Sequence, residues 1–190
     1  GIAFPFLGEK LRGERDMEFI AVEPSACPTL TRGKYAYDWG DTAKTGPVAK
    51  MHTVGHDFIP APVHAGGLRY HGMAPQVSQL ITEGILEPKA YPQMETYEAG
   101  MLVAKTEGFI SAPETNHALA CVIDEAKKAK EEGKEKVILF NFSGHGLIDL
   151  GAYDQFLAGN LSDYEYPAKE IEEAERVIAD HPKPQLIKSR

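Results

Sequence analysis

The stretch that decides the fold is Val137-Ile138-Leu139-Phe140-Asn141-Phe142-Ser143-Gly144-His145-Gly146. Its apolar start predicts a buried β-strand over residues 136–140, because β-branched and aromatic residues favour strands. The strand would deliver a hydroxyl and free backbone N–H groups to a turn of serine and glycine residues. Open α/β sheets bind their ligands at the carboxyl ends of strands, so Asn141–Gly146 is a candidate ligand site. A turn rich in glycine for its backbone geometry alone is the alternative, which the residues by themselves favour.

Outward from this stretch, helical and strand patterns alternate. We expect strands over residues 17–22 and 85–91, and helices over residues 75–84, 94–107 and 115–130. Residues 25–63 contain Gly and Pro throughout and predict a long loop, of a length that usually signals function or a partner. This alternation predicts an α/β fold with a parallel sheet. We expect one main region over residues 1–160, and a charged surface helix with a tail over residues 161–190.

Composition narrows the functional classes. The 190 residues carry a net charge of -8, which argues against a nucleic-acid binder. No apolar run approaches the ~20 residues of a membrane span, and no signal peptide is recognisable. We therefore expect a soluble, cytoplasmic chain. Its first residues are apolar at near-helical spacing without an initiator Met, which favours a fragment of a longer protein.

Three further segments carry candidate chemistry. His64–Gly72 interleaves glycines with Arg69 and Tyr70, so it could line a ligand or ion site or be an irregular surface loop. Glu114 lies at the predicted start of a helix, where capping by the carboxylate is the simpler explanation. His52 and His56 have metal-ligand spacing only on a helix, and Gly55 argues against one there, so we expect no metal.

Nearly the whole chain to about Leu161 resembles the carboxy-terminal part of tryptophan synthase β chains, and is most similar to the β-2 branch. Several long motifs in the right order carry the resemblance. They are residues 1–6 (GIAFPF), 19–24 (FIAVEP), 26–33 (ACPTLTRG), 64–72 (HAGGLRYHG), 106–108 (TEG), 112–114 (APE), 117–118 (HA) and 141–146 (NFSGHG).

The resemblance implies a three-layer α/β/α, mostly parallel sheet of the fold-type II pyridoxal-phosphate enzymes, with residues 1–160 as the carboxy-terminal part of the cofactor-binding catalytic region. It also implies the reaction of the β chains, which join indole to serine or O-phosphoserine to make tryptophan. Ser143 would contact the pyridine nitrogen of the cofactor, and a neutral hydroxyl there favours β-replacement over transamination. Asn141, Gly144 and Gly146 would line the cofactor, with Glu114 beside its ring and His117 supporting Glu114. Arg69, where the β-1 branch has an aspartate, would pair with a phosphorylated serine. A monovalent cation would bind the backbone carbonyls of Leu68 and Tyr70.

The resemblance also implies a cytoplasmic homodimer with a transient α-chain partner, and it reveals what these residues lack. The family's Schiff-base lysine, catalytic glutamate and indole tunnel belong to the amino-terminal half. We therefore expect these 190 residues to be inactive alone. The alternatives are a non-catalytic module that binds a partner or ligand, and another β-replacing or serine-deaminating enzyme of the same cofactor class.

Overall fold

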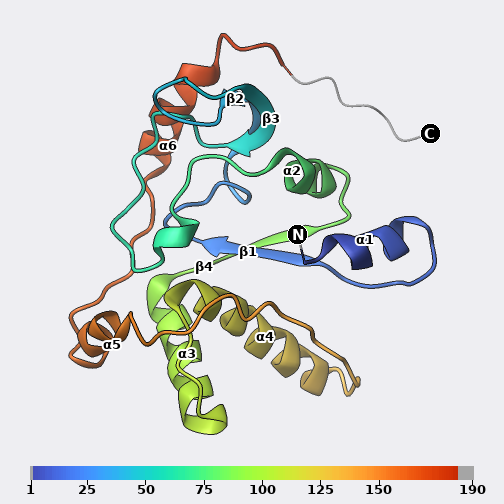
Figure 1. Cartoon of the computed structure of the whole chain (residues 1–190), viewed down its shortest axis with the longest axis vertical. Coiled ribbons are helices and arrows are strands. Elements are labelled where there is room, and N and C mark those ends of the chain that lie inside the picture. The colour runs from blue at the N-terminus through green and yellow to red at the C-terminus, as the bar shows by residue number, and fades with distance from the viewer. Residues whose placement is uncertain (1, 184–190) are drawn as a thin grey trace.

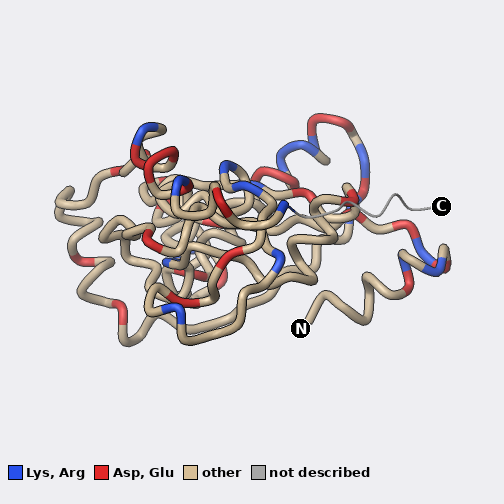
Figure 2. The backbone as a smooth tube through the Cα atoms, turned by 90° about the horizontal axis from the view of Figure 1, so that it is seen from above, with Lys and Arg blue, Asp and Glu red and all other residues tan. Residues whose placement is uncertain are grey.

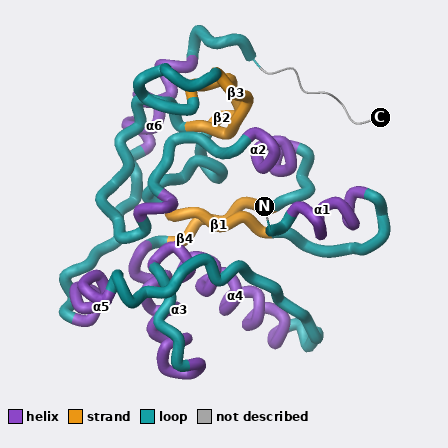
Figure 3. Tube along the Cα trace, viewed as in Figure 1, coloured by secondary structure: helices purple, strands orange, loops and turns teal. Residues whose placement is uncertain are grey.

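The computed structural model describes residues 2–183 and shows helices arranged around two small sheets (Figure 1; Figure 3). Gly1, which opens the first motif, and residues 184–190 of the expected tail lie outside the described residues. The helices are α1 (Phe4–Leu11), α2 (Pro75–Thr82), α3 (Gln93–Glu107), α4 (Pro113–Glu131), α5 (Leu150–Leu157) and α6 (Ala168–Glu175), with 3-10 turns η1 (Gly66–Leu68) and η2 (Arg176–Ile178). The strands are β1 (Ile20–Pro24), β2 (Lys34–Trp39), β3 (Val48–Thr53) and β4 (Glu87–Tyr91).

Strands β1 and β4 form a parallel pair across the middle of the molecule, with Ile20 opposite Glu87 and Pro24 opposite Tyr91. Helices α3, α4 and α5 lie on one side of this pair, and α2, the β2–β3 sheet and α6 lie on the other (Figure 1). Helices α3 and α4 pack on the pair through a core cluster of Tyr91, Ala99, Leu119, Ala120 and Cys121. Helices with parallel and antiparallel strands agree with the predicted α/β class.

The expected helices are confirmed. Helices α2 and α4 begin with proline at the first helical position, where the missing N–H costs nothing. Helix α3 ends at Gly108, whose φ of 76° is left-handed and therefore suits glycine. None of the helices between residues 2 and 183 is long and apolar enough to cross a membrane. Acidic and basic residues are interspersed along the described chain (Figure 2).

The long loop predicted over residues 25–63 is wrong, because it contains the antiparallel hairpin β2–β3. A buried carboxylate holds the hairpin together. Asp38 accepts hydrogen bonds from the Trp39 N–H (2.8 Å), the Thr53 hydroxyl (2.6 Å) and the His56 ring (Nδ1, 2.6 Å). The charged and glycine-containing sequence hides this strand pair, since its stability comes from side chains that meet only in the fold.

The carboxy-terminal helix is present as α6, but one of its faces is buried. Ile171 packs in a core cluster with Cys27, Val54, Phe58 and Tyr166. Tyr166 and Ile171 therefore complete a core with residues that come before and after the hairpin in the sequence.

The strand predicted over residues 136–140 is also wrong. Residues 134–144 form neither helix nor strand. The side chains expected in the core face solvent instead, since Val137 is 98% exposed and Leu139 is 77% exposed. A strand requires a hydrogen-bonded neighbour, and no strand of the described residues lies beside this run. Helix α5 follows, which the sequence pattern did not indicate.

Candidate active site

The turn Ser143–Gly146 lies against the start of helix α4. The Ser143 and Thr115 hydroxyl oxygens are 3.1 Å apart and share a hydrogen bond. The Gly144 N–H donates to the Thr115 hydroxyl oxygen at 3.1 Å. Ser143 is exposed, whereas Thr115 is buried, so the turn presents the Ser143 hydroxyl on an open face.

The backbone of the turn is seated on residues 110–112. The Ala112 N–H donates to the Gly144 carbonyl (2.9 Å), and the Gly146 N–H donates to the Ile110 carbonyl (2.8 Å). A Cβ at Gly146 would lie 2.4 Å from the Ser111 carbonyl oxygen, so only glycine fits there. The glycines thus allow close backbone contact, as the interpretation of this motif as a turn chosen for its backbone geometry predicts.

Glu114 joins a second motif to this site. It lies in the first turn of α4, where the helix dipole favours a carboxylate. Its Oε1 accepts the Gly67 N–H at 2.8 Å, which joins the loop 64–72 to the start of α4, next to the residue that holds the turn 143–146. Three segments far apart in sequence therefore meet at the start of α4.

His117, one turn further along α4, is buried. Its Nδ1 lies 2.9 Å from the Pro113 carbonyl oxygen, so that nitrogen carries the hydrogen and donates it. Burial lowers the pKa of His117 below its ordinary value, with a smaller opposing contribution from the hydrogen bond to Pro113. The lowered pKa favours the neutral form of the His117 ring, which lies one turn after Glu114 in α4.

The Arg69 side chain does not contact Glu114 or Ser143. It is exposed, and its Nη2 donates to the Pro60 carbonyl at 3.3 Å. No hydrogen bond or ion pair within residues 2–183 joins it to Glu114 or Ser143. The Tyr70 carbonyl, predicted as a cation ligand with that of Leu68, accepts the Thr29 hydroxyl at 3.1 Å. Burial raises the pKa of the Tyr70 phenol to about 12.

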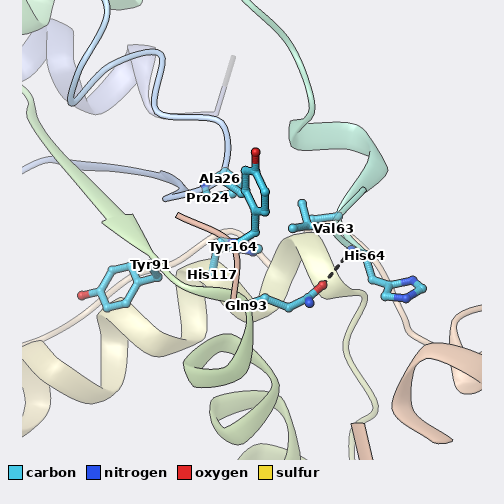
Figure 4. Close-up of a pocket in the computed structure, with 9 residues that line it drawn as sticks. Pro24, Ala26, Val63, His64, Tyr91, Gln93, His117 and Tyr164 are labelled. Carbon is cyan, nitrogen blue, oxygen red and sulfur yellow. Dashed lines mark hydrogen bonds between the residues drawn. The ribbon is translucent and has the colours of Figure 1, made fainter. Parts of the chain in front are cut away.

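A small pocket lies at the carboxyl ends of β1 and β4 (Figure 4). Pro24 and Tyr91, the last residues of the two strands, line it together with His64, His117 and Tyr164. The Gln93 side chain also lines it and accepts the His64 N–H at 2.9 Å. Sequence reasoning missed Gln93, although a polar residue two positions after a parallel strand is a usable signal.

The histidines of the fourth segment separate. His56 binds Asp38, whereas the His52 ring lies 3.3 Å from the Thr82 hydroxyl. Among the described residues, no group of three or more His, Cys, Asp or Glu side chains could hold a metal ion.

Comparison with known proteins gives close relatives. The chain is 59% identical over 165 residues to the tryptophan synthase β chain of Thermococcus onnurineus, and this match covers 87% of the chain. It is 57% identical over 165 residues to tryptophan synthase β chain 2 of Pyrococcus abyssi, and 55% identical over 166 residues to that of Aquifex aeolicus. The matches cover 87% and 86% of the chain. The chain is a homologue of tryptophan synthase β chains.

The tryptophan synthase β relatives are much longer than this chain. The matched residues make up 37% of the Thermococcus onnurineus protein and 38% of the other two, in their carboxy-terminal part. No family model matches the chain. Tryptophan synthase β chains are pyridoxal-phosphate-dependent enzymes, so the face that carries Ser143 and Glu114 is a candidate cofactor surface.

Proposed function

We propose that these residues form one wall of the active site of a tryptophan synthase β chain, which makes tryptophan from indole and serine or O-phosphoserine. The observation that carries the proposal is the meeting of Ser143, Thr115, Glu114 and Gly67 at the start of α4. Identity of 55–59% to the relatives supports the same conclusion. The parallel pair β1–β4 would then belong to a larger three-layer sheet.

The residues present suit a flat, nitrogen-containing ring. Gly144 and Gly146 have no side chains that would project toward a ring placed against the turn. The hydroxyl of the exposed Ser143 can donate a hydrogen bond to a ring nitrogen. Asn141 is also exposed and would border the cofactor. When bound, pyridoxal phosphate acts as the electron sink for the amino-acid substrate.

The residues of this chain would bind the cofactor and the substrate and orient them. Ser143 would hold the ring nitrogen through a neutral hydroxyl, a weak partner that favours β-replacement. Glu114, fixed by the Gly67 N–H, would place its carboxylate beside the ring. Arg69 would serve a phosphorylated serine after leaving the Pro60 carbonyl. The Leu68 and Tyr70 carbonyls would hold a monovalent cation, with Tyr70 sharing its oxygen with Thr29.

The lysine that attaches the cofactor would come from the remaining part of the β chain, so the 190 residues alone should be inactive. The proposal includes the cytoplasmic homodimer and the transient α-chain partner that the resemblance implies. Incubation of the isolated chain with pyridoxal phosphate, serine and indole should yield no tryptophan. Measurable tryptophan would contradict this part of the proposal.

The substitution Ser143→Ala in the complete β chain tests the cofactor surface. Loss of one hydrogen bond should weaken cofactor binding about tenfold and slow turnover. Absorbance titration with pyridoxal phosphate measures the affinity, and tryptophan formation measures the rate. The matched control is Ser162→Ala, an exposed serine whose carbonyl, and not its hydroxyl, binds Gln93. Equal affinity and rate in the two variants would remove Ser143 from the site.

A second function, as a half-protein that binds a partner, has one specific observation in its favour. A run of apolar side chains is exposed to solvent in the described chain, at Val137, Leu139, Phe140 and Phe142. Mixing the isolated chain with the separately expressed remaining part, followed by gel filtration, would reveal such a complex.

A further inference from the structure

Behind the turn 143–146 lies a cluster of three buried polar side chains. Tyr153, from α5, donates its hydroxyl hydrogen to the Ser111 carbonyl at 2.6 Å. The Asn116 side-chain amide donates to the same Tyr153 oxygen at 3.0 Å, and the Ser111 hydroxyl donates to the Asn116 carbonyl oxygen at 2.5 Å. Ser111 and Asn116 are fully buried, and Tyr153 is 5% exposed. In such surroundings a lost partner is costly, because water cannot replace it.

The cluster holds the part of the backbone on which the turn rests. Ile110 and Ala112, on either side of Ser111, make the hydrogen bonds to Gly146 and Gly144. The Ser111 carbonyl itself, bound by Tyr153, is the atom that leaves no room for a side chain at Gly146. A shift of Ser111 would therefore move the turn and the Ser143 hydroxyl with it.

The same cluster reaches the other side of the site. Asn116 follows Glu114 and Thr115 in the first turns of α4, so its bond to Tyr153 also fixes that end of the helix. Asn116 cannot move toward α3, because its side chain already fills the space over Gly100, where a Cβ would lie 2.5 Å from the Asn116 Oδ1 atom. One hydroxyl group thus connects the support of Ser143 with the support of Glu114.

We propose that Tyr153 is a positioning residue, which sets the Ser143 hydroxyl relative to the Glu114 carboxylate through Ser111 and Asn116. The inference rests on the proposed function, since it assigns Tyr153 a role in the same site. Tyr153 would touch neither cofactor nor substrate, and its effect would appear in how tightly and in what orientation the cofactor ring is held.

The chain offers a matched control in Tyr97. Its ring is fully buried and meets the Tyr153 ring edge to face, with 5.0 Å between centroids. Its hydroxyl has no hydrogen-bond partner among the described residues. Tyr153→Phe and Tyr97→Phe therefore each remove one buried hydroxyl from the same layer, but only the first breaks the cluster.

The experiment uses the complete β chain with pyridoxal phosphate as the probe. For Tyr153→Phe we expect three- to tenfold weaker cofactor binding, a changed circular-dichroism band of the bound cofactor, and a fall in kcat that exceeds any change in KM for indole. For Tyr97→Phe we expect wild-type values. A purely structural role would lower the melting temperature and leave the cofactor band unchanged, which would overturn the proposal.

Ser111→Ala keeps the inference testable where Tyr153→Phe does not fold. It removes only the bond from Ser111 to Asn116 and should change the cofactor band in the same direction by a smaller amount. An unchanged band in this variant would overturn the role of the cluster. Failure of the wild-type complete chain to bind pyridoxal phosphate would overturn the proposed function itself, whereas normal wild-type binding with equal behaviour of both tyrosine variants would overturn Tyr153 alone.

Discussion

The β2–β3 hairpin and the run 136–142 differ in whether each finds its partners within the described chain. In the hairpin, fully buried Asp38 accepts three hydrogen bonds, and each strand pairs with the other. The run 136–142 has the stronger strand composition, yet it remains unpaired, with most of its apolar side chains exposed. Strand propensity therefore did not decide which segment became a strand, and the availability of a neighbour did.

The largest effect should come from breaking the hairpin centre. Asp38→Ala leaves the Trp39 N–H, the Thr53 hydroxyl and the His56 ring without their common acceptor. We expect the free energy of unfolding to fall by about 3–5 kcal/mol, as measured by urea denaturation. Asp41→Ala, in the same hairpin but only half-buried, should cause a clearly smaller loss. Equal losses in the two variants would show that burial of Asp38 is unimportant.

A double substitution in the exposed run should have an effect that depends on its surroundings. In the isolated chain, Val137→Lys with Leu139→Lys should leave the free energy of unfolding within about 0.5 kcal/mol, because both side chains already face water. In the complete β chain, where we expect the run to be covered, the same change should cost roughly 2–4 kcal/mol. Denaturation of both proteins measures the difference, and equal costs would mean that the run stays exposed.

The smallest effect is a pH dependence from His117. Because burial lowers its pKa, the unfolded chain takes up a proton first, near pH 6.5. The stability that the neutral ring provides is complete above that pH and is lost as the pH falls through the lower pKa of the folded chain. His117→Asn retains a donor toward the Pro113 carbonyl without titrating. Its unfolding free energy should decline less between pH 7 and pH 5, and parallel curves would contradict the assignment.

Much of the helical framework could be predicted from the sequence, since Pro75 and Pro113 mark helix starts and Gly84 and Gly108 mark helix ends. These signals are local, and a local pattern specifies a helix because its hydrogen bonds are internal. The hairpin could not be predicted, because its centre depends on side chains that meet only in the fold. The unpaired run could not be predicted either, because a strand needs a neighbour, and the described residues provide none beside it.

The candidate site shows the same division. The sequence singled out Ser143, Glu114 and the loop 64–72, and the structure brings these three together. It does not bring Arg69 to them. Tyr153 could not be singled out from the residue pattern, because its hydrogen-bond acceptor is the Ser111 carbonyl, a backbone atom that no residue pattern reveals.

The parallel pairing of β1 with β4 has a consequence for the order of folding. Ile20 must find Glu87 across an intervening segment that contains the whole hairpin and helix α2. Contacts between residues far apart in sequence form slowly, because closing a long loop costs entropy before any bond is gained. The hairpin, which closes over a few residues, should therefore form early. Its formation would shorten the flexible segment between Ile20 and Glu87. The pocket at the ends of β1 and β4 would then be among the last parts of the molecule to assemble.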